Sequence, residues 1–113
     1  MRNNTIDYIE FNTTDLVKVK VFYSEVFWWE FKDFWDTYTA FSSSGVKWWF
    51  ELSDSVQKWG VLVVLYHDEL TEVKEKIIDS GGKITVDIFS FPGGERFEFS
   101  DPVWNVLAVW TEK

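Results

Sequence analysis

The spacing of apolar side chains predicts a strand followed by an amphipathic helix near the N-terminus. Apolar and polar residues alternate over 5–11, which is typical of a half-buried strand. Thr14 is expected to cap the helix, with Asp15 at its positive end. Over 15–27, apolar residues then recur at three- and four-residue steps and predict one buried helix face: Leu16, Val19, Phe22, Tyr23, Val26 and Phe27.

Three short strands are predicted after this helix. Aromatic or β-branched runs occupy 29–34, 37–42 and 46–52, and Asp36 and the run of serine and glycine at 42–45 separate them. Short runs joined by such residues are typical of strands connected by tight turns.

The second half of the chain repeats this order. An apolar strand at 59–66 precedes a helix that Asp68 is expected to cap. This helix is expected to stop at 81–82, where two glycines follow each other. Three more strands are predicted at 84–89, 96–100 and 106–111.

The sequence therefore predicts a single α+β domain made of two βαβββ modules, 1–54 and 55–113, that form a curved, mostly antiparallel mixed sheet around a concave cavity. Each module alone has a half-covered sheet, so pairing the modules leaves a concave inner surface. This surface is the default binding site.

Composition and charge narrow the function classes. The chain has 113 residues, 46% of them apolar, and a formal net charge of −8. A chain of this length can form only one hydrophobic core. The negative charge disfavours nucleic acid or an anionic membrane as a partner. No segment approaches the length of a membrane-spanning helix, and no signal peptide is recognisable, so we expect a cytoplasmic protein. The chain has no cysteine.

Aromatic residues are in excess, at 20% of the chain, with eight tryptophans among them. Aromatic rings bring large apolar area at low rotameric cost. The excess indicates either an aromatic-filled core or a site for a large apolar molecule.

Several motifs resemble the vicinal oxygen chelate superfamily, which includes glyoxalase-like enzymes, dioxygenases and bleomycin-resistance proteins. They are the runs at 14–16, 22–27 and 29–31, and the stretch from Phe97 through Asp101-Pro102 to Asn105 and Leu107. The resemblance implies paired βαβββ modules and assembly as a homodimer.

The same resemblance implies where a divalent metal would be held in the enzymes, on the first and last strands of each module. In this sequence those positions carry Tyr8, Leu62 and Ala108, none of which is an ordinary ligand of such a site. The single histidine, His67, lies at a helix start. We therefore expect no metal cofactor and no enzymatic activity.

Two tryptophans stand where the family typically has glycine. Trp28 follows the first helix and Trp104 lies in the last turn. Glycine in such places usually serves a positive φ, which a bulky residue adopts only at a cost. These replacements suggest the hypothesis of an engineered ligand binder whose cavity and rims were rebuilt with large side chains.

We expect the site to bind a bulky apolar molecule of steroid or secosteroid (vitamin-D-like) size, oriented by a few polar groups. Tyr8, Tyr66 and Glu98 are candidate polar anchors, with Arg96 beside Glu98. Alternation leaves open whether Trp48 or Trp49 faces inward. The expected ligand-binding residues are Tyr8, Glu10, Trp48, Trp49, Leu62, Val64, Tyr66, Phe91, Glu98, Trp104, Ala108 and Trp110.

Four alternatives remain at this stage. The rings could simply fill the core. The chain could sequester a cationic antibiotic as bleomycin-resistance proteins do, or be a metal-dependent enzyme of the glyoxalase or dioxygenase type. It could also be a packing or interface variant without a ligand, which the apolar Val17, Val21, Trp28 and Trp35 would fit. Glu10 and Glu51 could form an acid–base couple, although no companion histidine supports it.

Overall fold

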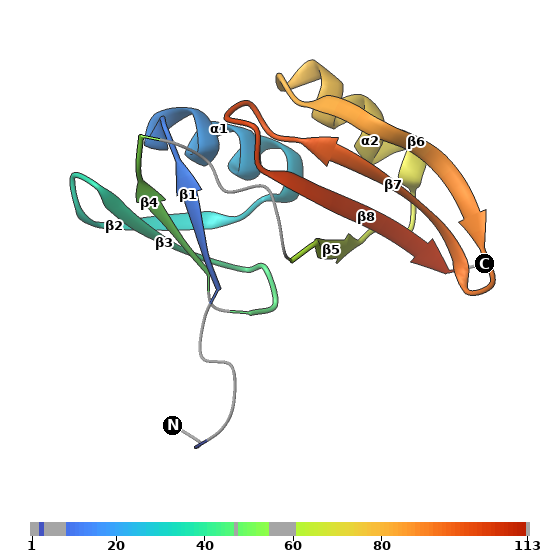
Figure 1. Cartoon of the computed structure of the whole chain (residues 1–113), viewed down its shortest axis with the longest axis horizontal. Coiled ribbons are helices and arrows are strands. Elements are labelled where there is room, and N and C mark those ends of the chain that lie inside the picture. The colour runs from blue at the N-terminus through green and yellow to red at the C-terminus, as the bar shows by residue number, and fades with distance from the viewer. Residues whose placement is uncertain (1–2, 4–8, 47, 55–60, 113) are drawn as a thin grey trace.

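The structure is a computed structural model that describes residue 3 and residues 9–46, 48–54 and 61–112, without the side chains of Trp35 and Trp48. The first module consists of β1 (Ile9–Thr13), α1 (Leu16–Phe27), β2 (Glu30–Trp35), β3 (Tyr38–Ser42) and β4 (Trp48–Leu52). Its strands form one sheet in the order β1-β4-β3-β2, in which β1 and β4 are parallel and the other pairs antiparallel (Figure 1).

The second module has the same architecture. It consists of β5 (Val63–Tyr66), α2 (Leu70–Asp79), β6 (Lys83–Phe91), β7 (Gly94–Ser100) and β8 (Val106–Glu112). The sheet order is β5-β8-β7-β6, with β5 and β8 parallel. The expected α+β fold of two βαβββ modules is confirmed, as two four-stranded mixed sheets with two helices among the described residues.

Both helices start differently from the prediction. Asp15, not Thr14, is the N-cap of α1, because Asp15 has extended backbone angles and its carboxylate accepts a 3.0 Å hydrogen bond from the Lys18 amide. At α2 the N-cap is Glu69, not Asp68, and no side chain caps it. Instead, the Glu69 amide donates to His67 Nδ1 at 2.9 Å. The predicted end of α2 is confirmed, since Asp79 is its last residue.

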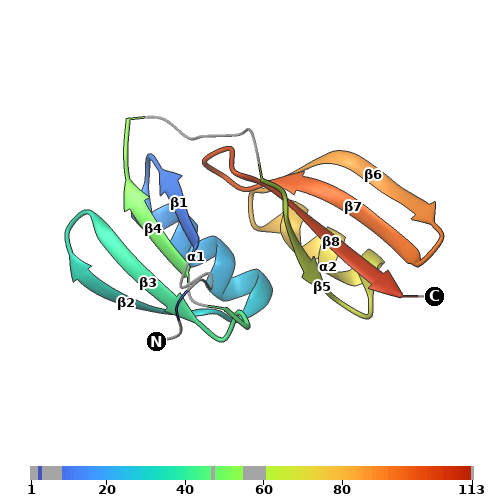
Figure 2. The same cartoon turned by 60° about the horizontal axis from the view of Figure 1, so that its bottom comes forward.

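Helix α1 packs between the two sheets and joins them into one core (Figure 2). The Tyr23 ring lies 5.5 Å from that of Phe50 in the first sheet, and the Phe22 and Phe27 rings each lie 6.1 Å from that of Phe99 in the second. The predicted buried face is confirmed for Val19, Phe22, Tyr23 and Val26, while Leu16 and Phe27 are half-buried.

Part of the aromatic excess fills this core. Trp29 is buried between two rings, parallel to that of Tyr23 at 4.7 Å and to that of Phe41 at 4.5 Å. Phe50, Phe97 and Phe99 are also buried. Core packing explains the presence of these buried rings, but it does not explain the tryptophans that are exposed.

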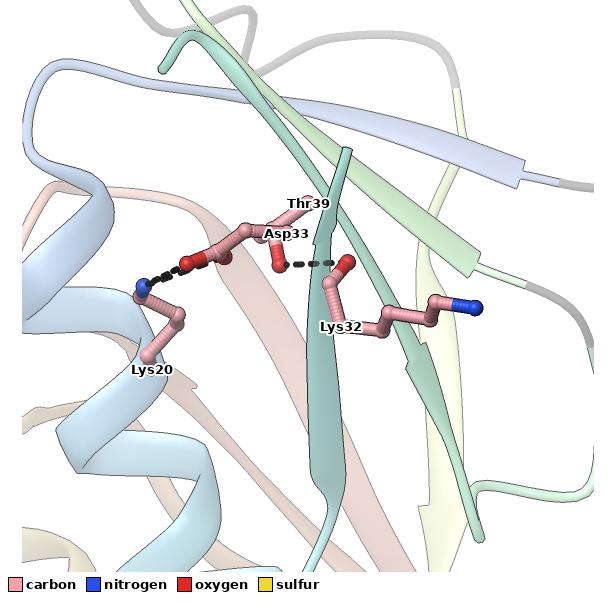
Figure 3. A network of polar contacts seen from close by, with 4 residues as sticks. All are labelled: Lys20, Lys32, Asp33 and Thr39. Carbon is pink, nitrogen blue, oxygen red and sulfur yellow. Dashed lines mark hydrogen bonds and ion pairs between the residues drawn. The ribbon is translucent and has the colours of Figure 1, made fainter. Parts of the chain in front are cut away.

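A polar contact holds α1 against the edge strand β2. Lys20 Nζ lies 3.0 Å from the Asp33 carboxylate, and one strand away the Thr39 hydroxyl donates to the Lys32 carbonyl at 3.2 Å (Figure 3). The hydrogen bond from Lys20 lowers the pKa of Asp33 below its ordinary value of 3.8.

The turn between β7 and β8 ties the two modules together. The Asp101 carboxylate accepts hydrogen bonds from the amides of Val103 and Asn105, each at 2.9 Å. The Asn105 side-chain amide donates to the Asn12 carbonyl of β1 at 3.0 Å. In the part of the chain that is described, neither helix is long and apolar enough to cross a membrane.

Candidate ligand-binding site

Each sheet has one face turned toward the helices and one turned away, here called its open face. On β8, Leu107 and Val109 are in the core, so alternation puts Ala108 and Trp110 on the open face of the second sheet. On β7, the same argument from buried Phe97 and Phe99 places Arg96 and Glu98 there. Cross-strand pairing then joins Arg96 to Trp110 and Glu98 to Ala108.

Four rings gather on this open face and are called the aromatic cluster. The Trp110 ring meets Tyr66 edge-on at 5.3 Å and lies 6.4 Å from Phe91, which in turn lies 6.5 Å from Phe89. Tyr66 is 50% exposed and Phe89 37% exposed. The cluster is therefore a partly solvated apolar wall, unlike the fully buried rings of the core.

A single charged pair lies within the aromatic cluster. Arg96 Nη2 lies 3.4 Å from Glu98 Oε2, as the sequence indicated that these two could pair. The Arg96 guanidinium lies 5.2 Å from the centre of the Phe89 ring, within the range of a cation–π contact. Its Nε is buried and has no acceptor. The pair supplies one donor group and one acceptor group on an otherwise apolar wall.

Most of the second-module residues predicted for the site share this face. Val64 of β5 pairs with Ala108 of β8, and Tyr66 of β5 pairs with Trp110 of β8. Since Ala108 and Trp110 also pair with residues of β7, this set of side chains extends across three neighbouring strands. Ala108 is fully buried and can form only the floor. Leu62 lies just before β5 and is 38% exposed.

Phe89 belongs to the aromatic cluster, although the sequence analysis did not name it. Strict alternation along 84–89 would place Ile84, Val86 and Ile88 on one face, away from Phe89. Register shifts interrupt β6 between Ile84 and Val86 and between Val86 and Phe89. Ile84 and Ile88 still pack against the core, so alternation puts Phe89 on the open face with Phe91, and this signal could have identified it.

The first-module residues lie on a different sheet. Glu10 and Trp49 are cross-strand partners on the open face of the first sheet. Trp49 lies on the face opposite buried Phe50, which answers the orientation question for Trp49. The Tyr8 prediction falls outside the described residues, as does the Trp48 side chain.

Trp49 also belongs to an aromatic group. It stacks on Tyr38 at 4.6 Å and lies 5.2 Å from Phe34. The Tyr38 hydroxyl donates a 2.7 Å hydrogen bond to Glu10 Oε1. A hydrogen bond shared with Glu10 raises the pKa of Glu51, and repulsion between the two carboxylates adds to this. The face thus combines rings with a carboxyl pair.

Trp28 and Trp104 occupy the backbone conformation that the sequence indicated. Their φ angles are 62° and 76°, in the left-handed region that favours glycine. Trp104 is 51% exposed in the turn before β8, with Lys83 Nζ 4.8 Å from its ring centre. Trp104 therefore lies in the turn outside the aromatic cluster. That these residues were introduced by design stays a hypothesis.

The residues present do not fit the metal site that the family resemblance implies. Leu62 and Ala108 carry no donor atom, and Glu98 on the neighbouring strand is bonded to Arg96. Within the described ranges, no three His, Cys, Asp or Glu side chains are placed to hold a metal ion.

Solved structures similar to this one share its fold at low sequence identity. A glyoxalase/bleomycin resistance protein/dioxygenase family enzyme from Burkholderia phytofirmans matches 95% of this chain and 98% of its own, with a TM-score of 0.83 and 14% identity. The fosfomycin resistance protein FosX from Listeria monocytogenes matches 99% of this chain and 96% of its own, with a TM-score of 0.83 and 17% identity.

A putative glyoxalase family protein from Bacillus anthracis covers 100% of both chains, with a TM-score of 0.75 and 20% identity. No protein-family model matches the sequence, and neither does any curated protein. At these identities the comparisons establish the architecture alone. The chain therefore has the glyoxalase-like fold of two βαβββ modules.

Proposed function

We propose that this protein binds a bulky apolar small molecule on the aromatic cluster of the second sheet and does not catalyse a reaction on it. The observation that carries the proposal is the group of Tyr66, Phe89, Phe91 and Trp110 around one charged pair, with two of the rings substantially exposed. Aromatic walls with few polar groups are typical of small-molecule sites.

The Arg96–Glu98 pair determines which polar groups of a ligand could be held in a fixed orientation. Arg96 can donate and Glu98 can accept, so a ligand hydroxyl or carbonyl would find a partner at the centre of the apolar wall. Burial contributes about 25 cal/mol per Å² of apolar area, so a molecule of steroid or secosteroid size gains most of its affinity from the rings. The proposed ligand class is a rigid, largely apolar molecule with one or two polar groups.

The proposal includes a homodimer. The open faces expose apolar side chains, among them Phe34 at 48% and Val64 at 42%, and a second copy could cover them. Sedimentation velocity tests this part, and a monomer at all concentrations up to about 100 µM would contradict it.

Intrinsic tryptophan fluorescence, titrated with a neutral sterol, tests the binding site. We expect saturable quenching, and Trp110→Ala should weaken sterol binding about tenfold or more, because the central ring of the cluster is lost. Trp104→Ala is the matched control, since it removes an exposed tryptophan outside the cluster. Equal sterol affinities in the two variants would place any binding elsewhere and contradict the proposal.

A second candidate function is the sequestration of a cationic drug on the first open face. The observation that favours it is the Glu10–Glu51 pair beside the stacked Tyr38 and Trp49 rings, because a cation could contact both carboxylates and rings. Bleomycin is the probe. Binding that is lost in Glu51→Gln and falls steeply with salt, with no response to sterol, would favour this function over the first.

A further inference from the structure

A cleft at the C-terminal end of α1 borders the second open face, whose edge residues Val64 and Tyr66 line part of it. Its volume is about 510 Å³, within the range of small-molecule sites. The end of α1, the turn between β3 and β4, strand β5 and helix α2 line it. Of the residues that the sequence analysis assigned to a site, it includes Val64 and Tyr66 of the edge strand β5.

Strained backbone concentrates at this cleft. Three non-glycine residues in the described part of the chain have positive φ, and two of them, Trp28 (62°) and Ser43 (70°), line the cleft. The left-handed conformation is unfavourable for an L-residue, because its Cβ comes too close to the following carbonyl oxygen. At Trp28 this conformation ends α1, a position that glycine usually occupies, so the bulky side chain is the unusual feature.

Packing does not compensate for the strain at Trp28. The side chain is 77% exposed, so it gains little from burial. Lys76 Nζ of α2 lies 5.9 Å from the centre of its ring. A large, exposed ring is thus held at the cleft by an unfavourable backbone conformation, and a flat ligand would supply the burial that the fold does not.

The charges around the cleft indicate an uncharged ligand. Glu72 and Lys76 both line the cleft and lie 3.5 Å apart on one helix face, so they compensate each other. The net charge of −8 over the whole chain disfavours anions. A cation would have to compete with Lys76 for the face of Trp28.

Polar groups at the cleft can supply hydrogen bonds to such a ligand. His67 lines it, and because its Nδ1 accepts from the Glu69 amide, the neutral ring carries its proton on Nε2 and can donate. Ser43 and Ser44 add hydroxyl oxygens from the β3–β4 turn, where the Ser44 hydroxyl itself donates to the Val46 carbonyl at 2.7 Å.

We propose that this cleft is a second binding site, which takes an uncharged planar heteroaromatic molecule that stacks on the Trp28 indole. Hydrogen-bond acceptors and donors at the edge of the molecule meet His67 and the two serine hydroxyls. The cleft shares Tyr66 with the aromatic cluster, but its stacking surface, Trp28, lies outside the cluster, so different variants test the two sites.

The probe is 2-quinolone, a neutral bicyclic lactam, and the control is its saturated decahydro analogue, which keeps the lactam but is not flat. The readout is the indole N–H signals of ¹⁵N-labelled protein, where the Trp28 signal is identified by its absence in Trp28→Gly. We expect 2-quinolone to shift the Trp28 signal saturably and the saturated analogue to leave it in place.

Two variants with the same backbone change separate ligand binding from strain. Trp28→Gly and Trp104→Gly each relieve a positive φ, so both are expected to fold. Trp28→Gly should weaken 2-quinolone binding about tenfold, which corresponds to ~1.4 kcal/mol, and Trp104→Gly should leave the affinity within about twofold. Equal affinities in the two variants, no shift of the Trp28 signal, or equal binding of the saturated analogue would each overturn the proposal.

Discussion

The Tyr23 hydroxyl donates a 3.0 Å hydrogen bond to the Asp101 carboxylate, and both side chains are buried. Tyr23 lies on α1 of the first module and Asp101 in the last turn of the second, so this bond crosses between the modules. The Asn105 amide bonds both Asp101 and the Asn12 carbonyl, which extends the contact to β1. A buried polar network of this kind makes the relative position of the modules specific.

Removing the Tyr23 hydroxyl should destabilise the fold. Tyr23→Phe keeps the ring and leaves the buried Asp101 carboxylate with one donor fewer, so we expect the free energy of unfolding to fall by about 1–3 kcal/mol. Urea denaturation measures this. Tyr66→Phe is the control, since Tyr66 is half exposed and its loss should change stability by less than about 0.5 kcal/mol. A Tyr23→Phe change no larger than this control would contradict the role of the bond.

The ionisation of Tyr23 should make the fold less stable at alkaline pH. Burial, the charge of Asp101 and the hydrogen bond to it raise the pKa of Tyr23 well above its ordinary value of 10.0. The folded state therefore holds a proton that the unfolded state releases above pH 10, so this contribution is complete below pH 10 and is lost as the pH rises further. Denaturation midpoints between pH 9 and pH 11 should fall more steeply in the original chain than in Tyr23→Phe. Parallel slopes would show that Tyr23 does not titrate differently in the two states.

In acid, two surface ion pairs act in the opposite direction. A hydrogen bond from Lys20 lowers the pKa of Asp33, and a hydrogen bond from Lys74 lowers the pKa of Asp87. Because the folded pKa values lie below 3.8, the pairs stabilise the fold above that pH and lose this effect as the pH falls through the folded pKa. Asp33→Asn should flatten the acid limb of the stability curve.

Lys20→Met should have the same effect as Asp33→Asn, and the double variant should add nothing, because both remove one pair. Salt should weaken the effect, since the Asp33 side chain is 57% exposed. An acid limb that stays unchanged in all three variants would show that the pair does not contribute.

Glycine should stabilise the chain at two positions where tryptophan now stands. Trp28→Gly and Trp104→Gly each remove a left-handed L-residue, and we expect each to raise the free energy of unfolding by about 1 kcal/mol. Thermal unfolding measures the gain. Val17→Gly, on the exposed face of α1, is the control of opposite sign and should cost about 1 kcal/mol. Destabilisation in both tryptophan variants would mean that contacts of the rings outweigh the strain.

The adjacent glycines of the β6–β7 hairpin should differ in their tolerance of a methyl group. A Cβ at Gly94 would collide with the Thr111 carbonyl oxygen on β8, which is backbone and cannot move aside. At Gly93 the nearest atom is 3.2 Å away on the Phe91 ring, which can shift. We expect Gly94→Ala to cost about 1–3 kcal/mol and Gly93→Ala less than about 0.5 kcal/mol, measured by urea denaturation. Similar costs would contradict the close approach of the β7 and β8 backbones.

Local patterns in the sequence determined the elements and their order. The three- and four-residue spacing from Leu16 to Phe27 predicted the buried face of α1, because helical geometry alone puts those positions on one side. The repeat of the strand and helix order predicted the two modules. The positive φ of Trp28 and Trp104 was expected from the family resemblance, because the superfamily typically has glycine at both positions.

Only the tertiary structure decided which side chains share a site. Trp49 and Trp110 both lie on open faces, but on different sheets, because register and sheet order are long-range properties that no short pattern encodes. Alternation puts Phe89 on the open face, but only the pairing of β6 with β7, which sets Phe89 opposite Arg96, places it in the aromatic cluster. The cleft beside Trp28 combines segments from both modules, so its shape depends on how α1 packs between the sheets, and that packing is determined by the whole core at once.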